Sequence, residues 1–263
     1  MSFSASGSEQ AVLAFYVRSV GPEWLDESLT VSGDHCRHDI GSASAPVSMS
    51  RAGRFEATLD GPMVDRLGQL ARDLCALDPM APPVEGQLAV RASWEGAVAD
   101  IGLSGPAPTR PLAPAETAAR AAFIELAERC RNGGTAAIAL SAALGPGTQG
   151  VGGPTSVRFQ VTNIGRLAVT FALAPTEVGA WWAQPRTGSS TAKQDLILVD
   201  DAGGYLGGVT TPARLEPGRR ALGALVDVLP AGTPAQAVRV AAGGRIYVDD
   251  SEMRFRVHAL LAE

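Results

Sequence analysis

Alternation of apolar and polar residues beyond residue 134 is the feature that most restricts the fold of this chain. Val157, Phe159 and Val161 are separated by polar neighbours, and similar segments recur almost to the last residue. A period of two places every second side chain on the same face of a strand. About eight such segments, separated by turns rich in Gly, Pro and Asp, predict an all-β sandwich.

The first half of the chain combines this period with a helical one. Leu13, Phe15 and Val17 alternate with more polar residues, as expected for a half-buried strand. Behind a predicted N-cap at Asp60, apolar side chains instead recur at helical spacing, and a second helical pattern ends at Cys130. Paired strands with helices between them predict an α+β domain, an antiparallel sheet with two helices.

A boundary is expected at Asn132-Gly133-Gly134, where the second helical pattern stops. Asn and Gly are typical of a helix C-cap followed by a flexible connection. We therefore predict an α+β domain over residues 1–133 and a β-sandwich domain over residues 134–263. The Gly-rich stretch at 145–154 is an alternative boundary.

Composition excludes some functions. Hydrophobic residues make up 46% of the chain, which is enough for a sizeable core. The net charge is −5 and there is no run of Lys or Arg, so we expect no nucleic-acid partner. Neither a signal peptide nor a membrane-spanning segment is indicated, and the three widely spaced cysteines suggest reduced thiols. These features predict a cytoplasmic protein without a membrane partner.

Several turns of the second half support a resemblance to a known family. A strand ending in Thr162-Asn163, the turn Asp200-Asp201-Ala202-Gly203 and the turn Leu215-Glu216-Pro217-Gly218 occur in that order. This order is similar to bacterial immunoglobulin-like β-sandwich domains of the intracellular proteinase inhibitor family. The resemblance implies an immunoglobulin-like sandwich that binds another protein.

The first half resembles a second family of inhibitors. Its strand, helix, hairpin and helix order, with Leu67-Gly68-Gln69-Leu70-Ala71 in the first helix, is similar to emfourin-like protease inhibitors. The segment 36–50 departs from that family's pattern, and no diagnostic inhibitory residue is present. Both resemblances imply a non-catalytic adaptor or inhibitor-like protein, with a protein partner whose identity the sequence leaves open.

One dense polar cluster suggests a different class of function. Asp34, His35, Cys36 and His38 follow one another within five positions, and all three residue types are ligands for zinc. On a strand, Asp34, Cys36 and His38 would project to one face. The alternative prediction is thus a metal-dependent factor or enzyme centred on His35, Cys36 and His38. The alternative without a functional role is an exposed polar strand or loop beside a turn.

Two adjacent tryptophans, Trp181 and Trp182, are the candidate protein interface. Neighbouring residues on a strand point to opposite faces, so one indole can be in the core while the other is exposed as an anchor. The alternative is that both pack against the edge of the sandwich. No catalytic motif and no cofactor are predicted, and a structural subunit that assembles through edge strands is a third hypothesis.

Overall fold

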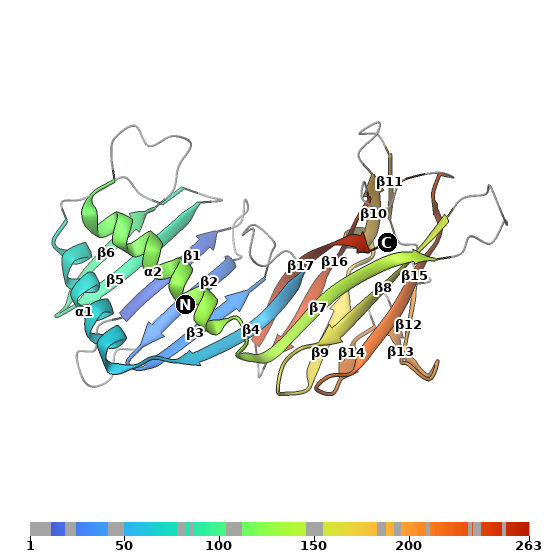
Figure 1. Cartoon of the computed structure of the whole chain (residues 1–263), viewed down its shortest axis with the longest axis horizontal. Helices are drawn as coiled ribbons and strands as arrows, with labels where there is room; N and C mark the ends of the chain where they lie inside the picture. Colours follow the sequence, from blue (N-terminus) through green and yellow to red (C-terminus); the bar gives the residue numbers. More distant parts are fainter. Residues whose placement is uncertain are drawn as a thin grey trace. The chain divides into compact units, whose positions relative to one another are not determined.

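In the computed structural model, the chain forms two compact units that are not continuous in sequence (Figure 1). Unit 1 contains residues 1–39 and 56–133, and unit 2 contains residues 40–55 and 134–263. The structure describes residues 12–18, 25–41, 50–77, 83–84, 87–103, 112–145, 155–182, 188–191, 196–208, 211–230, 233, 238–248 and 251–262.

Unit 1 contains an antiparallel sheet in the order β6, β5, β1, β2. Their bounds are β6 Ala97–Gly102, β5 Leu88–Trp94, β1 Val12–Arg18 and β2 Leu25–Ser32. The turn at Gly33, with a φ of 60°, leads from β2 into β3 (His35–Ile40). Leu13, Phe15 and Val17 are buried as predicted for the first strand, but Tyr16 on the opposite face is buried as well, so both faces of β1 are covered there.

Both predicted helices are present and cover one face of this sheet (Figure 1). Helix α1 runs from Gly61 to Cys75 and α2 from Pro114 to Cys130. The side chain of Asp60 accepts a hydrogen bond from the Met63 amide at 2.9 Å, so the predicted N-cap is confirmed. Neither helix is long and apolar enough to cross a membrane, as judged over the described residues.

Unit 2 contains two groups of strands around one apolar core. The first group consists of β7 (Gly134–Gly145), β8 (Thr155–Asn163), β15 (Arg220–Leu229), β12 (Ile197–Val199) and β13 (Tyr205–Gly208). The second consists of β17 (Ser251–Ala262), β16 (Val238–Val248), β9 (Val169–Leu173), β14 (Ala213–Leu215), β10 (Gly179–Trp182) and β11 (Gly188–Thr191). A 3-10 turn, η1 (Pro175–Glu177), precedes β10.

The core of unit 2 is built from small and medium aliphatic side chains with few aromatic rings. Phe159 and Phe171 lie in it with Ile138, Val240 and Val257, all less than a tenth exposed. Residues from both groups of strands belong to the same cluster. The parallel pairing of Leu261 with Ala142 also joins β17 to β7.

The predicted fold class is wrong, because the chain does not form an α+β domain followed by a separate sandwich. Its described strands belong to one 17-stranded, largely antiparallel sheet. Strand β4 (Arg51–Thr58) begins in unit 2, where it pairs with β7, and ends in unit 1. Alternation reveals that a segment is a strand but not which strand it pairs with. The pairing of β4 with β7 could therefore not be derived from the local pattern.

Candidate functional site

The polar cluster expected to bind a metal is divided between the two faces of β3. His35 is exposed and lies 3.7 Å from a carboxylate oxygen of Glu56. Cys36 and His38 are buried on the opposite face, and Asp34 lies in the preceding turn. The alternation of β3 therefore separates His35 from Cys36 and His38.

Cys36 contacts the thiol of Cys130. Its Sγ lies 3.5 Å from Sγ of Cys130 at the end of α2, and both residues are fully buried. The hydrogen bond with Cys130, followed by burial, raises the pKa of Cys36. Since the thiolate is the nucleophile and the metal ligand, Cys36 is a poor candidate for either role.

His38 forms a buried pair with Glu27 of β2. Nε2 of His38 lies 2.7 Å from Oε1 of Glu27, and both side chains are less than 5% exposed. The other oxygen, Oε2, has no hydrogen-bond partner among the described residues. The ring of Phe123 from α2 lies edge-on to His38, so this pair is enclosed under the helix. Across the described part of the chain, no three His, Cys, Asp or Glu side chains are placed to hold a metal.

Trp181 and Trp182 form the end of strand β10. Trp181 pairs with Arg239 on one side and Ser189 on the other, and Trp182 pairs with Val238 and Gly188. Their side chains lie outside what the structure describes. The predicted protein interface at these two residues stays a prediction.

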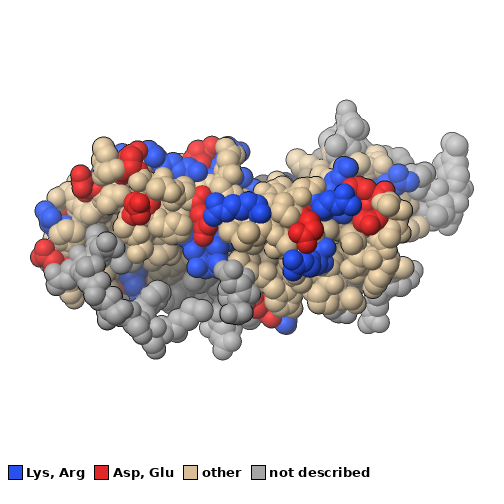
Figure 2. All heavy atoms as spheres, turned by 90° about the horizontal axis from the view of Figure 1, so that it is seen from below, with Lys and Arg blue, Asp and Glu red and all other residues tan. Residues whose placement is uncertain are grey.

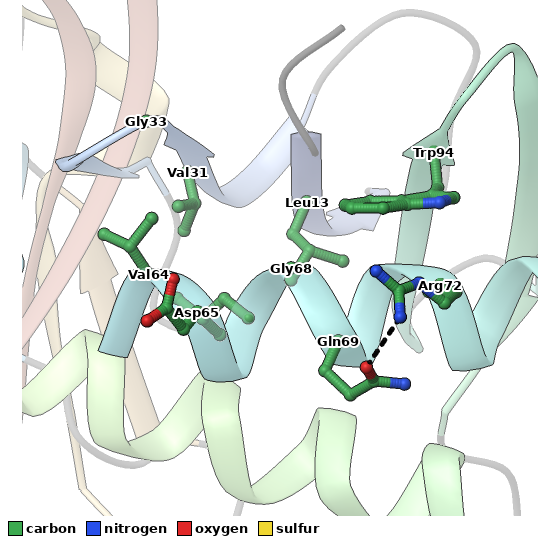
Figure 3. Close-up of a pocket in the computed structure, with 10 residues that line it drawn as sticks. Leu13, Val31, Gly33, Val64, Asp65, Gly68, Gln69, Arg72 and Trp94 are labelled. Carbon is green, nitrogen blue, oxygen red and sulfur yellow. Dashed lines mark hydrogen bonds between the residues drawn. The ribbon is translucent and has the colours of Figure 1, made fainter. Parts of the chain in front are cut away.

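The structure brings together a pocket that the sequence analysis did not identify. It lies in unit 1 between α1 and the end of the sheet, and its volume is about 310 Å³ (Figure 3). Leu13, Val31 and Leu67 are buried and contribute apolar surface. Trp94 lies at one end of the pocket and Asp65 toward the other.

The indole of Trp94 is held in place by a cation-π contact. The guanidinium carbon of Arg72 lies 4.6 Å from the centre of the Trp94 ring. Arg72 also donates a hydrogen bond of 3.0 Å to the side-chain oxygen of Gln69 (Figure 3). Trp94 continues the inward alternation of β5, and Arg72 lies one turn beyond Gly68 on α1. These contacts pack Arg72 over the indole at this end of the pocket.

Gly68 keeps this pocket open. A Cβ at this position would meet Cζ3 of Trp94 at 3.7 Å, an ordinary van der Waals contact, so a longer side chain would occupy the pocket. The sequence contained one signal that could have indicated this pocket, namely Gly68 inside a helical pattern, where glycine is less favourable than alanine. Its partners could not be recognised, because Trp94, Leu13 and Val31 come from three different strands.

The fold and the pocket together define a β-rich protein with a small apolar recess. Comparison with known proteins assigns it to no family. The chain matches no model of a known protein family, and no curated protein or solved structure is similar to it at a significant level. The resemblances to immunoglobulin-like and emfourin-like inhibitors thus stay predictions.

Proposed function

We propose that this chain is a non-catalytic protein-binding protein, and that the Trp94 pocket receives an apolar side chain of its partner. The observation on which this depends is the pocket itself. Its floor is made of the buried residues Leu13, Val31 and Leu67, and the indole of Trp94 forms a wall. Buried aromatic and aliphatic anchors in such recesses contribute most of the energy of many protein interfaces.

The arrangement of polar groups favours a protein partner over a small metabolite. Small-molecule sites place a few polar groups inside an apolar cavity, where these groups orient the ligand. In this pocket the polar side chains Asp65, Gln69 and Arg72 are exposed at the helix surface, while the buried lining is apolar. The recess therefore supplies mainly apolar contact area with its charged groups at the rim, as expected for one anchor side chain of a larger partner.

The volume of the pocket agrees with a single anchor side chain as its occupant. About 310 Å³ is near the lower limit for pockets that enclose a whole small molecule. It is ample for one Leu, Met or Phe side chain, whose burial contributes roughly 1.5–3 kcal/mol. Exposed charges at Arg72 and Asp65 would then contact the backbone or polar neighbours of the anchor.

Selection of peptides from a random display library against the full-length protein tests this function. We expect the selected peptides to share one bulky apolar residue and to bind Gly68→Leu at least about tenfold more weakly than the original protein. The control is Gly61→Ala on the same helix, where an added Cβ meets nothing within 4 Å, and it should bind normally.

Thermal unfolding of each variant shows that the loss comes from a filled pocket and not from a damaged fold. Gly68→Ala serves as an intermediate, because its Cβ makes only an ordinary contact with Trp94. Failure to select any peptide, or equal affinity for Gly68→Leu and the original protein, would contradict the proposal.

A further inference from the structure

Two buried thiols of unit 1 lie against each other where helix α2 meets strand β3. Sγ of Cys130, the last residue of α2, lies 3.5 Å from Sγ of Cys36 and 3.8 Å from the Cys36 carbonyl oxygen. Both side chains are fully buried. A disulfide has a sulfur–sulfur distance of about 2.05 Å, so small rotations of the two side chains would bring the sulfurs within bonding distance.

A second contact between the same two elements supports this placement of the thiols. The ring of Phe123 on α2 lies edge-on to the ring of His38 on β3, with 6.2 Å between their centres. Phe123 and Cys130 are seven residues apart, which places them on one face of the helix. Cys36 and His38 are two residues apart and are buried on one face of the strand. The thiol contact thus belongs to a packed interface between α2 and β3.

The two thiols differ in their readiness to lose a proton. The hydrogen bond with Cys36 lowers the pKa of Cys130, although burial and the charge of Glu56 act in the opposite direction. The same hydrogen bond, together with burial, raises the pKa of Cys36. Because the thiolate is the nucleophile, Cys130 is the sulfur that attacks an oxidant, and Cys36 is the thiol that reacts second.

We propose that Cys36 and Cys130 form a redox-active pair that hydrogen peroxide converts into an intramolecular disulfide, which fixes the end of α2 to β3. First, the Cys130 thiolate attacks one peroxide oxygen and the O–O bond breaks. Cys130 becomes a sulfenic acid, and the hydroxide that leaves takes up a proton to form water. Cys36 then attacks the oxidised sulfur, the S–O bond breaks, and a second water leaves with the Cys36 proton. In total, two thiols lose two electrons and one peroxide becomes two waters.

The end of α2 provides a path to this buried pair. Exposed Arg131 and Asn132 follow Cys130 directly. The Gly133 amide donates a hydrogen bond of 2.9 Å to the Cys130 carbonyl, and the Arg131 amide donates one of 3.1 Å to the Glu128 carbonyl. Opening these two bonds would release the last turn of the helix, and helix ends open more readily than helix centres.

A small, uncharged oxidant fits this path. Hydrogen peroxide has two heavy atoms, so a partial opening of the last helical turn is enough to admit it. Basic and acidic side chains are intermixed on the molecular face seen in Figure 2. That face therefore has no large field of one sign that would concentrate a charged oxidant.

The third cysteine of the chain is a built-in control. Cys75 ends α1 and is partly exposed, and its Sγ donates to the carbonyl oxygen of Ala97 at 3.7 Å. Burial raises the pKa of Cys75. If exposure alone decided reactivity, Cys75 would be oxidised before the buried pair. The order of oxidation therefore separates the effect of pairing from the effect of exposure.

Treatment of the reduced full-length protein with hydrogen peroxide tests the pair. We expect the free thiols to fall from three to one, and peptide mapping to find Cys36 joined to Cys130. The melting temperature should rise by at least about 5 °C, because the cross-link joins residues 94 positions apart and restricts the unfolded chain. Dithiothreitol should reverse both changes. Cys75→Ala should behave as the original protein does, whereas Cys36→Ala, checked for folding by circular dichroism, should form no cross-link.

Four outcomes would overturn the proposal. They are oxidation of Cys75 before the pair, disulfides between molecules, three thiols remaining after treatment, and a cross-linked protein with an unchanged melting temperature. Gly68→Leu alters the Trp94 pocket and leaves both thiols in place, so it should form the cross-link normally. A failed pocket and a failed thiol pair are therefore distinguishable.

Discussion

At the scale of single residues, the least expected feature is the buried pair of Glu27 and His38. Two ionisable side chains less than 5% exposed lose nearly all contact with water, and one oxygen of Glu27 has no hydrogen-bond partner in the described part of the chain. Such pairs add little net stability compared with apolar residues, but breaking one leaves a buried polar group without compensation. The sequence showed His38 as a candidate ligand, whereas the structure places it in a structural contact.

Replacing His38 by Ala should therefore destabilise the protein by about 3–5 kcal/mol, because the Glu27 carboxylate loses its contact. The double variant Glu27→Leu/His38→Leu should lose less free energy of unfolding than His38→Ala alone, since no polar group is then buried without a partner. Urea unfolding measures both values. The exposed pair Arg131 and Glu128 is the control, and Arg131→Ala should change stability by less than about 1 kcal/mol. A small effect of His38→Ala would refute this interpretation.

At the scale of elements, helix α1 shows how local sequence fixes a boundary. Asp60 has extended backbone angles and accepts a hydrogen bond from the Met63 amide, and Pro62 lies in the first turn. Met63, Leu67, Leu70 and Leu74 are then buried along one side. The N-cap and the apolar stripe both lie within one short segment of the chain, so both could be predicted from the sequence.

Asp60→Ala should lower the free energy of unfolding by about 1 kcal/mol, because the amides of the first turn lose their acceptor. Asp73→Ala, near the other end of α1, is the matched control. Removing an acidic side chain there should be neutral or slightly stabilising, since it reduces an unfavourable interaction with the helix dipole. Chemical denaturation compares the two, and equal losses would argue against a capping role for Asp60.

At the scale of the whole molecule, β4 is the element that the two units share. Gly53 pairs with Ala137 of β7 and has a φ of 127°, a region that favours glycine. A Cβ at this position would lie 2.3 Å from the carbonyl oxygen of Ala136. The same strand continues to Thr58, beyond the point where unit 1 resumes. The close backbone approach at Gly53 thus supports the pairing of β4 with β7.

Gly53→Ala should destabilise the protein by more than about 2 kcal/mol, through backbone strain together with the loss of β4–β7 pairing. Because Gly53 pairs with Ala137, hydrogen exchange should become faster in β7. Gly203→Ala is the control, since Gly203 has a φ of 83° but nothing within 4 Å of an added Cβ. Unchanged exchange in β7, or an equal loss of stability in Gly203→Ala, would contradict a specific role of Gly53 in the β4–β7 pairing.

Features that depend on neighbours along the chain could be predicted from residue patterns alone. The burial of Leu13 and Phe15, the helical stripe behind Asp60 and the shared face of Cys36 and His38 on β3 follow from side-chain period and capping, whereas the burial of that shared face does not. Three-dimensional packing was needed to establish that β4 pairs with β7 and that three strands and α1 enclose the Trp94 pocket. These arrangements join residues far apart in sequence, and the free energy that selects one pairing over another comes from packing and register, which no local pattern contains.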